Sequence, residues 1–127
     1  MRTLGFSVGH DKGAVVIEDG KVVVGITQER LTRVKHDGAY QGGKIPYESI
    51  LYCLNYLGLT INDIHSFVYS TTELYDDVEE QFKDKFGDKN YNLRFIPHHL
   101  AHAYSSFFSS GFEESSVIVA DASGSIL

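Results

Sequence analysis

Apolar residues occupy every second position in three short stretches near the start of the chain. They are, in order, Leu4, Phe6 and Val8, then Val15 and Ile17, then Val22, Val24 and Ile26. A period of two is typical of β-strands. The Asp19-Gly20 pair between the second and third stretches is a strong signal for a two-residue hairpin turn. The pattern therefore predicts three strands in an antiparallel meander between Thr3 and Gln28.

A helical period replaces this alternation in the middle of the chain. Between Pro46 and Gly58, apolar residues recur every three or four positions, which predicts an amphipathic helix over Tyr47 to Leu57 with a glycine terminator. The preceding polar segment, Glu29 to Lys44, predicts a loop. The following residues predict a strand at Phe67 to Tyr69, a charged helix over Asp76 to Phe86, and a strand over Leu93 to Ile96.

The last part of the chain combines one helix with one apolar run. His98 to Ser110 contains neither Pro nor Gly and is followed by Gly111, which favours a helix. Val117 to Ala120 is continuously apolar, which is typical of a strand covered on both faces. The alternation of strands and helices predicts an α/β fold. Because a further strand would begin near Ile126, we expect the chain to be a truncated piece of a longer protein.

Composition and charge limit the kinds of function and of binding partner that the chain can have. The chain has 127 residues, of which 43% are hydrophobic and 22% are charged, as expected for one globular domain. Its formal charge of -6 argues against nucleic acid or an anionic membrane as a partner. The single cysteine, Cys53, excludes an internal disulfide, and its helical spacing from Ile50 and Leu57 predicts a buried thiol rather than a nucleophile. The start of the chain lacks the apolar run of a signal peptide, which indicates a cytoplasmic protein.

A metal site is predicted around the first turn of the last helix. His98 and His102 are four residues apart, so both imidazoles project from one helix face, whereas His99 points elsewhere. Asp121 follows the apolar run and supplies a carboxylate. Two imidazoles and one carboxylate suit a divalent transition ion such as iron, zinc or manganese, with open positions for substrate oxygens. The histidines taken alone also suit a simple helix start.

Anion binding is predicted at two small-residue turns and one basic stretch. The backbone amides of the first turn, Ser7 to Gly13, could bind a phosphate, and Lys12 supplies a positive charge there. An ordinary hairpin turn has the same composition. Ser123 and Gly124 form a second small-residue turn after Asp121. The basic stretch of Arg30, Arg33, Lys35 and His36 is either a solvated loop or an anion clamp that faces the first turn.

These segments together resemble one enzyme family. Ser7 to Ala14 with its His10-Asp11 pair, Gln28 to Asp37, and His98 to Ala103 followed by Phe107 to Phe112 and Asp121, look like the carbamoyltransferases of the nodulation-protein and antibiotic O-carbamoylation type. The resemblance implies the actin-like, sugar-kinase-like ATPase fold, which is ribonuclease H-like, with a mixed sheet and flanking helices. By this resemblance residues 1–112 form the first half of an actin-like domain and residues 113–127 begin the second half.

The resemblance also implies a reaction. In this family a second domain, absent here, makes carbamoyl adenylate from ATP and carbamoyl phosphate, and the actin-like domain transfers the carbamoyl group to an acceptor hydroxyl. It implies His98, His102 and Asp121 as metal ligands, with iron as the first expectation, and His10 as the base on the acceptor. The candidate substrate contacts are Ser7, Gly9, Asp11, Lys12, Arg33, Lys35, Ser123 and Gly124.

Some features of the sequence leave other interpretations open. Ala122 stands where the family usually has Gly, and Lys12 where it often has Ser. A relative of the tRNA threonylcarbamoyl transferases, a sugar kinase, and a non-catalytic nucleotide-binding module are the alternatives. A homodimer is one assembly to consider, and we expect the chain alone to lack transferase activity.

Overall fold

The computed structural model describes residues 1–9, 11–37, 43–72 and 77–121. Its elements are β1 (Arg2–Val8), β2 (Gly13–Glu18), β3 (Lys21–Thr27), α1 (Gln28–Thr32), the short 3-10 helix η1 (Lys35–Asp37), α2 (Tyr47–Leu57), the 3-10 helix η2 (Ile61–Asp63), β4 (Ser66–Thr71), α3 (Val78–Phe86), β5 (Arg94–Pro97) and α4 (His98–Ser110). The strands form one sheet in the order β3-β2-β1-β4-β5. The first three strands are antiparallel, whereas β4 and β5 run parallel to β1.

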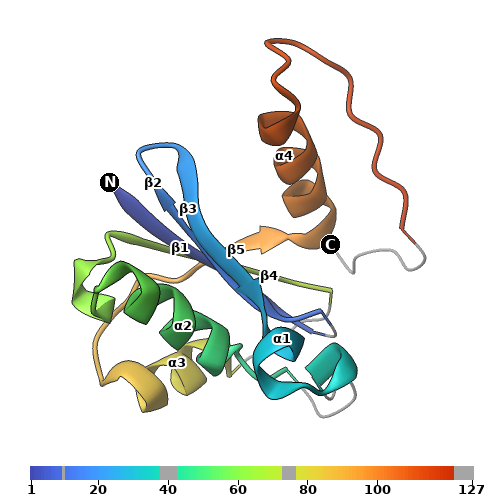
Figure 1. Ribbon diagram of the computed structural model, residues 1–127. Coiled ribbons are helices and arrows are strands. Elements are labelled where there is room, and N and C mark those ends of the chain that lie inside the picture. The colour runs from blue at the N-terminus through green and yellow to red at the C-terminus, as the bar shows by residue number, and fades with distance from the viewer. Residues whose placement is uncertain (10, 38–42, 73–76, 122–127) are drawn as a thin grey trace.

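Helices α2 and α3 cover one face of this sheet, and α4 lies beyond the opposite face next to β5 (Figure 1). The alternation along β1 puts Leu4, Phe6 and Val8 on the covered face, where all three are buried. Burial of such side chains stabilises the fold by about 1.5–3 kcal/mol each. The hydrophobic core therefore lies between the sheet and α2 and α3.

An aromatic cluster joins α3 to the sheet. The ring of Phe82, which is fully buried, lies 5.6 Å from that of Phe6, 5.5 Å from that of Phe67 and 4.9 Å from that of Tyr91, measured between centroids. The Phe67 and Tyr91 contacts are edge-on, an arrangement that aromatic rings favour. Phe82 thus fixes α3 over the middle of the sheet.

The opposite face of the sheet carries small side chains. In one row across the strands, Val15 lies between Gly5 of β1 and Gly25 of β3. In the next row Ser7 of β1 lies between Gly13 and Ser70. These residues leave a shallow floor beneath α4, on which the candidate site is built.

Most predicted elements are confirmed. The α/β class, the mixed sheet and its antiparallel opening meander are present, and the helix over Tyr47–Leu57 has the predicted bounds. The helix over His98–Ser110 also forms and ends at Gly111, which has a φ of 77°. Cys53 is buried as predicted. No helix in the described part of the chain is long and apolar enough to cross a membrane.

The predicted loop over Glu29 to Lys44 is wrong in its first part. Residues Gln28–Thr32 form α1, and Lys35–Asp37 form η1. The helix is stabilised by a tertiary contact at its start, where Gln28 is 3% exposed. Polar composition alone does not reveal such an anchor. The rest of the predicted loop lies partly outside the described residues.

The predicted buried strand at Val117 to Ala120 is also not formed. These residues have no regular secondary structure, and Ile118 is 93% exposed. A strand covered on both faces needs hydrogen-bonded neighbours, and no strand in the described ranges pairs with this segment. After α4 the chain instead runs as an extended segment towards Asp121 (Figure 1).

Candidate functional site

Three predicted metal ligands come together beside the first turn of α4. Nε2 of His98 lies 2.6 Å from Oδ2 of Asp121 and 3.1 Å from Nε2 of His102. The third distance, from Nε2 of His102 to Oδ2 of Asp121, is 3.7 Å. The side chain of His98 is 19% exposed, and those of Asp121 and His102 are 31% and 50% exposed. Histidine and carboxylate from segments 19 or more positions apart thus form one compact cluster.

The local sequence explains how this cluster forms. β5 passes directly into α4 at Pro97, which has a φ of -54°, so the first helical turn lies at the carboxyl end of the sheet. His98 and His102 are one turn apart on the same face of α4. Asp121 reaches them from the extended segment that follows the helix. His99 is not part of the cluster, as the sequence predicts.

The donor set fits a transition-metal ion. Two atoms that each lie about 2.1 Å from a metal are about 3.0–3.5 Å apart in tetrahedral or octahedral geometry. The separation of 3.1 Å falls within this range, 3.7 Å lies just above it and 2.6 Å lies below it, so small shifts of the side chains would bring all three atoms to this spacing. Two imidazoles with one carboxylate are characteristic of sites that keep open positions for substrate.

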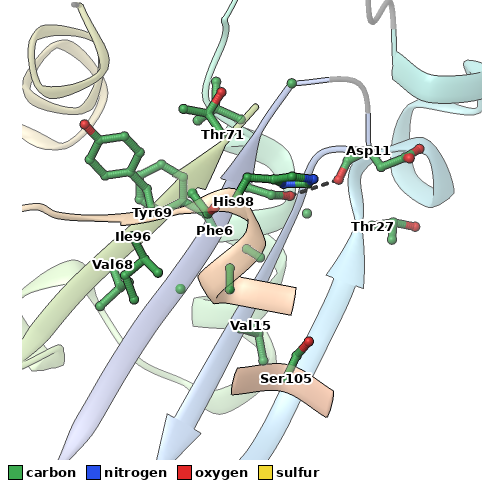
Figure 2. Close-up of a pocket in the computed structure, with 18 of the residues that line it drawn as sticks. Phe6, Asp11, Val15, Thr27, Val68, Tyr69, Thr71, Ile96, His98 and Ser105 are labelled. Carbon is green, nitrogen blue, oxygen red and sulfur yellow. Dashed lines mark hydrogen bonds between the residues drawn. The ribbon is translucent and has the colours of Figure 1, made fainter. Parts of the chain in front are cut away.

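The cluster lies at the rim of a cavity of about 1030 Å³ between α4 and the small-residue face of the sheet. Residues from all five strands and from α4 line this cavity, and Figure 2 shows among them Val15, Val68, Ile96, His98 and Ser105. The floor is largely apolar, whereas hydroxyl groups and charged side chains line the end near the first turn. The cavity is large enough for a substrate of several functional groups.

The first turn and the basic stretch face each other, which the sequence left open. Nδ1 of His36 lies 2.9 Å from Oδ1 of Asp11, and the backbone N-H of His36 donates to Oε2 of Glu29. The hydroxyl of Ser7 donates to the carbonyl of Asp11 over 2.9 Å. The backbone N-H of Gln28 donates to the carbonyl of Lys12. These contacts hold α1 and η1 against the turn.

The predicted anion-binding residues have different positions. Ser7, Gly9 and Asp11 line the cavity. Lys12 is only 5% exposed and does not line it, and Arg33 and Lys35 are exposed and do not line it either. His10, Ser123 and Gly124 lie outside the described residues. Arg30 lines the cavity but was not among the predicted substrate contacts. Its place in the basic stretch is the sequence signal that could have found it.

Comparison with known proteins identifies the family. Residues 2–92 match the family described as "Carbamoyltransferase N-terminus". The chain belongs to this family. It is similar to the nodulation protein NolNO of Sinorhizobium fredii, with 32% identity over 139 aligned residues that cover 91% of this chain and 20% of that protein. The family resemblance inferred from the motifs is therefore confirmed.

The chain matches only part of the length of its curated relatives. An uncharacterized protein of Synechocystis is 26% identical over 91% of this chain and 24% of its own length. The chain thus spans about a fifth to a quarter of these two curated relatives. The crystal structure of a Ppx/GppA family member from Aquifex aeolicus aligns with 89% of this chain and 41% of that chain, at 18% identity and a TM-score of 0.38.

Proposed function

We propose that this chain is the N-terminal part of a metal-containing carbamoyltransferase of the actin-like fold. In this proposal the complete enzyme moves a carbamoyl group from carbamoyl phosphate, through carbamoyl adenylate made with ATP, to the hydroxyl of a small-molecule acceptor. The observation that carries it is the cluster of His98, His102 and Asp121 at the rim of a cavity, in a chain of the carbamoyltransferase family.

The three clustered side chains are proposed to hold one divalent ion, with iron as the first candidate and zinc or manganese as the others. Such an ion, when bound, supplies Lewis-acid polarisation of a carbonyl or phosphoryl oxygen. Nε2 of His98 and of His102 and a carboxylate oxygen of Asp121, the atoms that face one another in the cluster, would hold the ion. The hydrogen bonds of the cluster hold the three side chains close to the arrangement that binding requires.

The first turn is proposed to bind the activated carbamoyl group. Ser7, Gly9 and Asp11 line the cavity, whereas Lys12, Arg33 and Lys35 do not line it and are proposed to add positive charge from the neighbouring segments. His10, next to Asp11 in sequence, is proposed to take the proton of the acceptor hydroxyl. Ser123 and Gly124, which follow Asp121, are proposed to contact the phosphate.

The transfer step conserves atoms and charge. The acceptor oxygen forms a bond to the carbamoyl carbon, and the bond from that carbon to the phosphate oxygen of the adenylate breaks. AMP leaves, and the hydroxyl proton passes to the imidazole of His10. A positioned general base typically contributes 10²–10⁴-fold to such a rate.

Metal binding by the chain tests the first half of this proposal. Titration with Co²⁺, followed by its visible absorption, should show tetrahedral or five-coordinate ligand-field bands. His98→Ala and His102→Ala should each weaken binding at least about tenfold, since even partners outside the first coordination shell contribute that much. The matched control His99→Ala should bind like the wild type. Unchanged Co²⁺ binding in both His98→Ala and His102→Ala would show that the pair is only structural.

A chimera tests the second half. The chain replaces the matching segment of NolNO, so that the remaining four-fifths of a family member is present. We expect product from ATP, carbamoyl phosphate and a sugar acceptor with the chimera, and none with the 127-residue chain alone. His10→Asn in the chimera should leave carbamoyl-adenylate formation intact and lower transfer about a hundredfold or more. A chimera that folds and forms the adenylate but transfers normally with Asn at position 10 would remove His10 from the mechanism.

A further inference from the structure

Among the lysines and arginines in the described part of the chain, Arg30 alone lines the cavity. The other charged or titratable side chains along the cavity are Asp11, Tyr69, His98, His102 and Asp121. The two carboxylates outnumber the one guanidinium, so the cavity without a metal ion favours an anion less than the cavity that holds one. A divalent ion on the histidine cluster reverses this balance and leaves the guanidinium and the ion as two separate positive charges.

The backbone that carries the exposed side chain of Arg30 is fixed from its N-terminal side by Gln28. This side chain is 3% exposed, and its carbonyl oxygen accepts hydrogen bonds from the backbone N-H of Ser49 at 3.0 Å and from the Ser49 hydroxyl at 2.7 Å. Its amide nitrogen donates to Glu48, and its backbone N-H donates to the carbonyl of Lys12 at 2.8 Å. The start of α1 is thus tied both to α2 and to the end of the first turn.

The same segment is fixed from its C-terminal side. Arg33 has a φ of 61° and its backbone N-H donates to the carbonyl of Glu29, which ends α1 after little more than one turn. Three residues later His36 contacts Asp11. Arg30 therefore lies on a short segment that is anchored to the cavity wall at both ends.

Arginine at such a position suits a phosphoryl group. Its planar guanidinium donates parallel hydrogen bonds to two oxygens, and a place fixed in advance reduces the entropy lost on binding. We propose that Arg30 binds the phosphoryl group of the substrate in this cavity, and that Gln28 is the residue that positions Arg30. The assignment of that substrate to carbamoyl phosphate or its adenylate rests on the proposed function.

Titration of the isotope-labelled chain by NMR, in the presence of Co²⁺, tests Arg30. The probes are carbamoyl phosphate, AMP and inorganic phosphate. Arg30→Gln should weaken phosphoryl binding about ten- to a hundredfold, as expected for charge-assisted hydrogen bonds of about 1.5–3 kcal/mol. Arg30→Lys should recover part of this loss. The matched control Lys21→Gln, which removes an exposed positive charge from the β2–β3 hairpin, should bind like the wild type.

Exchanging the amide of Gln28 and the carboxylate of Glu48 tests whether Gln28 positions Arg30. Gln28→Glu places a carboxylate against Glu48 and should weaken phosphoryl binding, whereas the double variant Gln28→Glu with Glu48→Gln restores the complementary pair and should restore binding. Adding Arg30→Gln to the Gln28→Glu variant should weaken phosphoryl binding little further. A Gln28→Glu variant with a lower melting temperature but full affinity would show that Gln28 is structural only.

The outcomes separate this inference from the proposed function. Arg30→Gln with unchanged affinity for carbamoyl phosphate overturns the role of Arg30 but leaves the carbamoyltransferase proposal standing. Binding of AMP and phosphate that depends on Arg30, without binding of carbamoyl phosphate, supports Arg30 and contradicts the proposed substrate. A wild-type chain that binds none of the three probes overturns both.

Discussion

Single polar side chains close several short turns of this fold by binding backbone groups. Asp63 is one example, since its carboxylate accepts hydrogen bonds from the backbone N-H of Thr60 at 2.7 Å and from the Thr60 hydroxyl at 2.8 Å. This capping box starts η2, which leads the chain from α2 into β4. The hydrogen bond from the Thr60 backbone, followed by that from its side chain, lowers the pKa of Asp63 below its usual value of 3.8.

This contact predicts a pH-dependent contribution to stability. A carboxyl with a lower pKa in the folded state stabilises the fold above the pKa of the unfolded chain, and this contribution is lost as the pH falls through the folded-state pKa. Asp63→Asn should therefore lower the melting temperature at pH 7, and the difference from the wild type should shrink below a pH of about 3.8. Thermal unfolding of both proteins from pH 7 to pH 3 measures this. A difference that stays constant over that range would contradict the prediction.

At the scale of elements, the sequence predicts what depends on local periodicity and misses what depends on tertiary contact. The helix over Tyr47–Leu57 has its own apolar stripe and glycine stop, so its bounds are predictable. α1 has neither, and forms around the buried amide of Gln28. The approach of His98 to His102 was predictable from their spacing, and Asp121 joins them although the strand expected before it does not form. Arg30 was predicted only as one member of a basic stretch, because such a stretch does not show which of its side chains lines the cavity.

Substitution by alanine should have different effects on stability at two glycines of the sheet. A Cβ atom on Gly13 would lie 2.9 Å from the backbone oxygen of Ile26, so Gly13→Ala forces neighbouring strands apart. We expect a loss of about 1–3 kcal/mol in the free energy of unfolding. A Cβ on Gly25 meets Val15 and backbone atoms of β2 no closer than 3.4 Å, which is ordinary contact.

Gly25→Ala should therefore cause no loss of stability, since alanine also reduces the freedom of the unfolded chain. Urea denaturation of the two variants beside the wild type measures both effects. Equal destabilisation by the two substitutions would mean that strand packing at Gly13 is looser than its contacts indicate.

At the scale of the whole molecule, stability is distributed unevenly about the sheet. α2 buries Ser49, Ile50, Cys53 and Leu54, whereas no residue of α4 is buried. The outer side of α4 carries exposed apolar residues, among them Tyr104 at 46% and Phe108 at 76% exposure. The sheet with α2 and α3 therefore forms the stable body, and α4 contributes His98 and His102 to the candidate site from a weakly packed position.

This distribution predicts two classes of amide exchange. Amides of α4 should exchange with solvent through local opening, at a lower free energy than those of α2, which should open only with global unfolding. Hydrogen exchange followed by NMR measures both helices in one sample. Saturating Co²⁺ should slow exchange in α4 and leave α2 nearly unchanged, because the ion ties His98 and His102 to Asp121. Equal protection of the two helices without metal would contradict the weak packing of α4.

The buried thiol of Cys53 reports how often the hydrophobic core opens. The side chain is inaccessible, its sulfur lies 3.6 Å from the carbonyl of Ala14, and burial raises the pKa of the thiol. An alkylating reagent reacts with thiolate and so modifies this position only after α2 has separated from β2. Since the chain has one cysteine, each modified molecule records one such event. The rate at which the mass of the chain increases therefore measures how often the core opens, without any denaturant or attached dye.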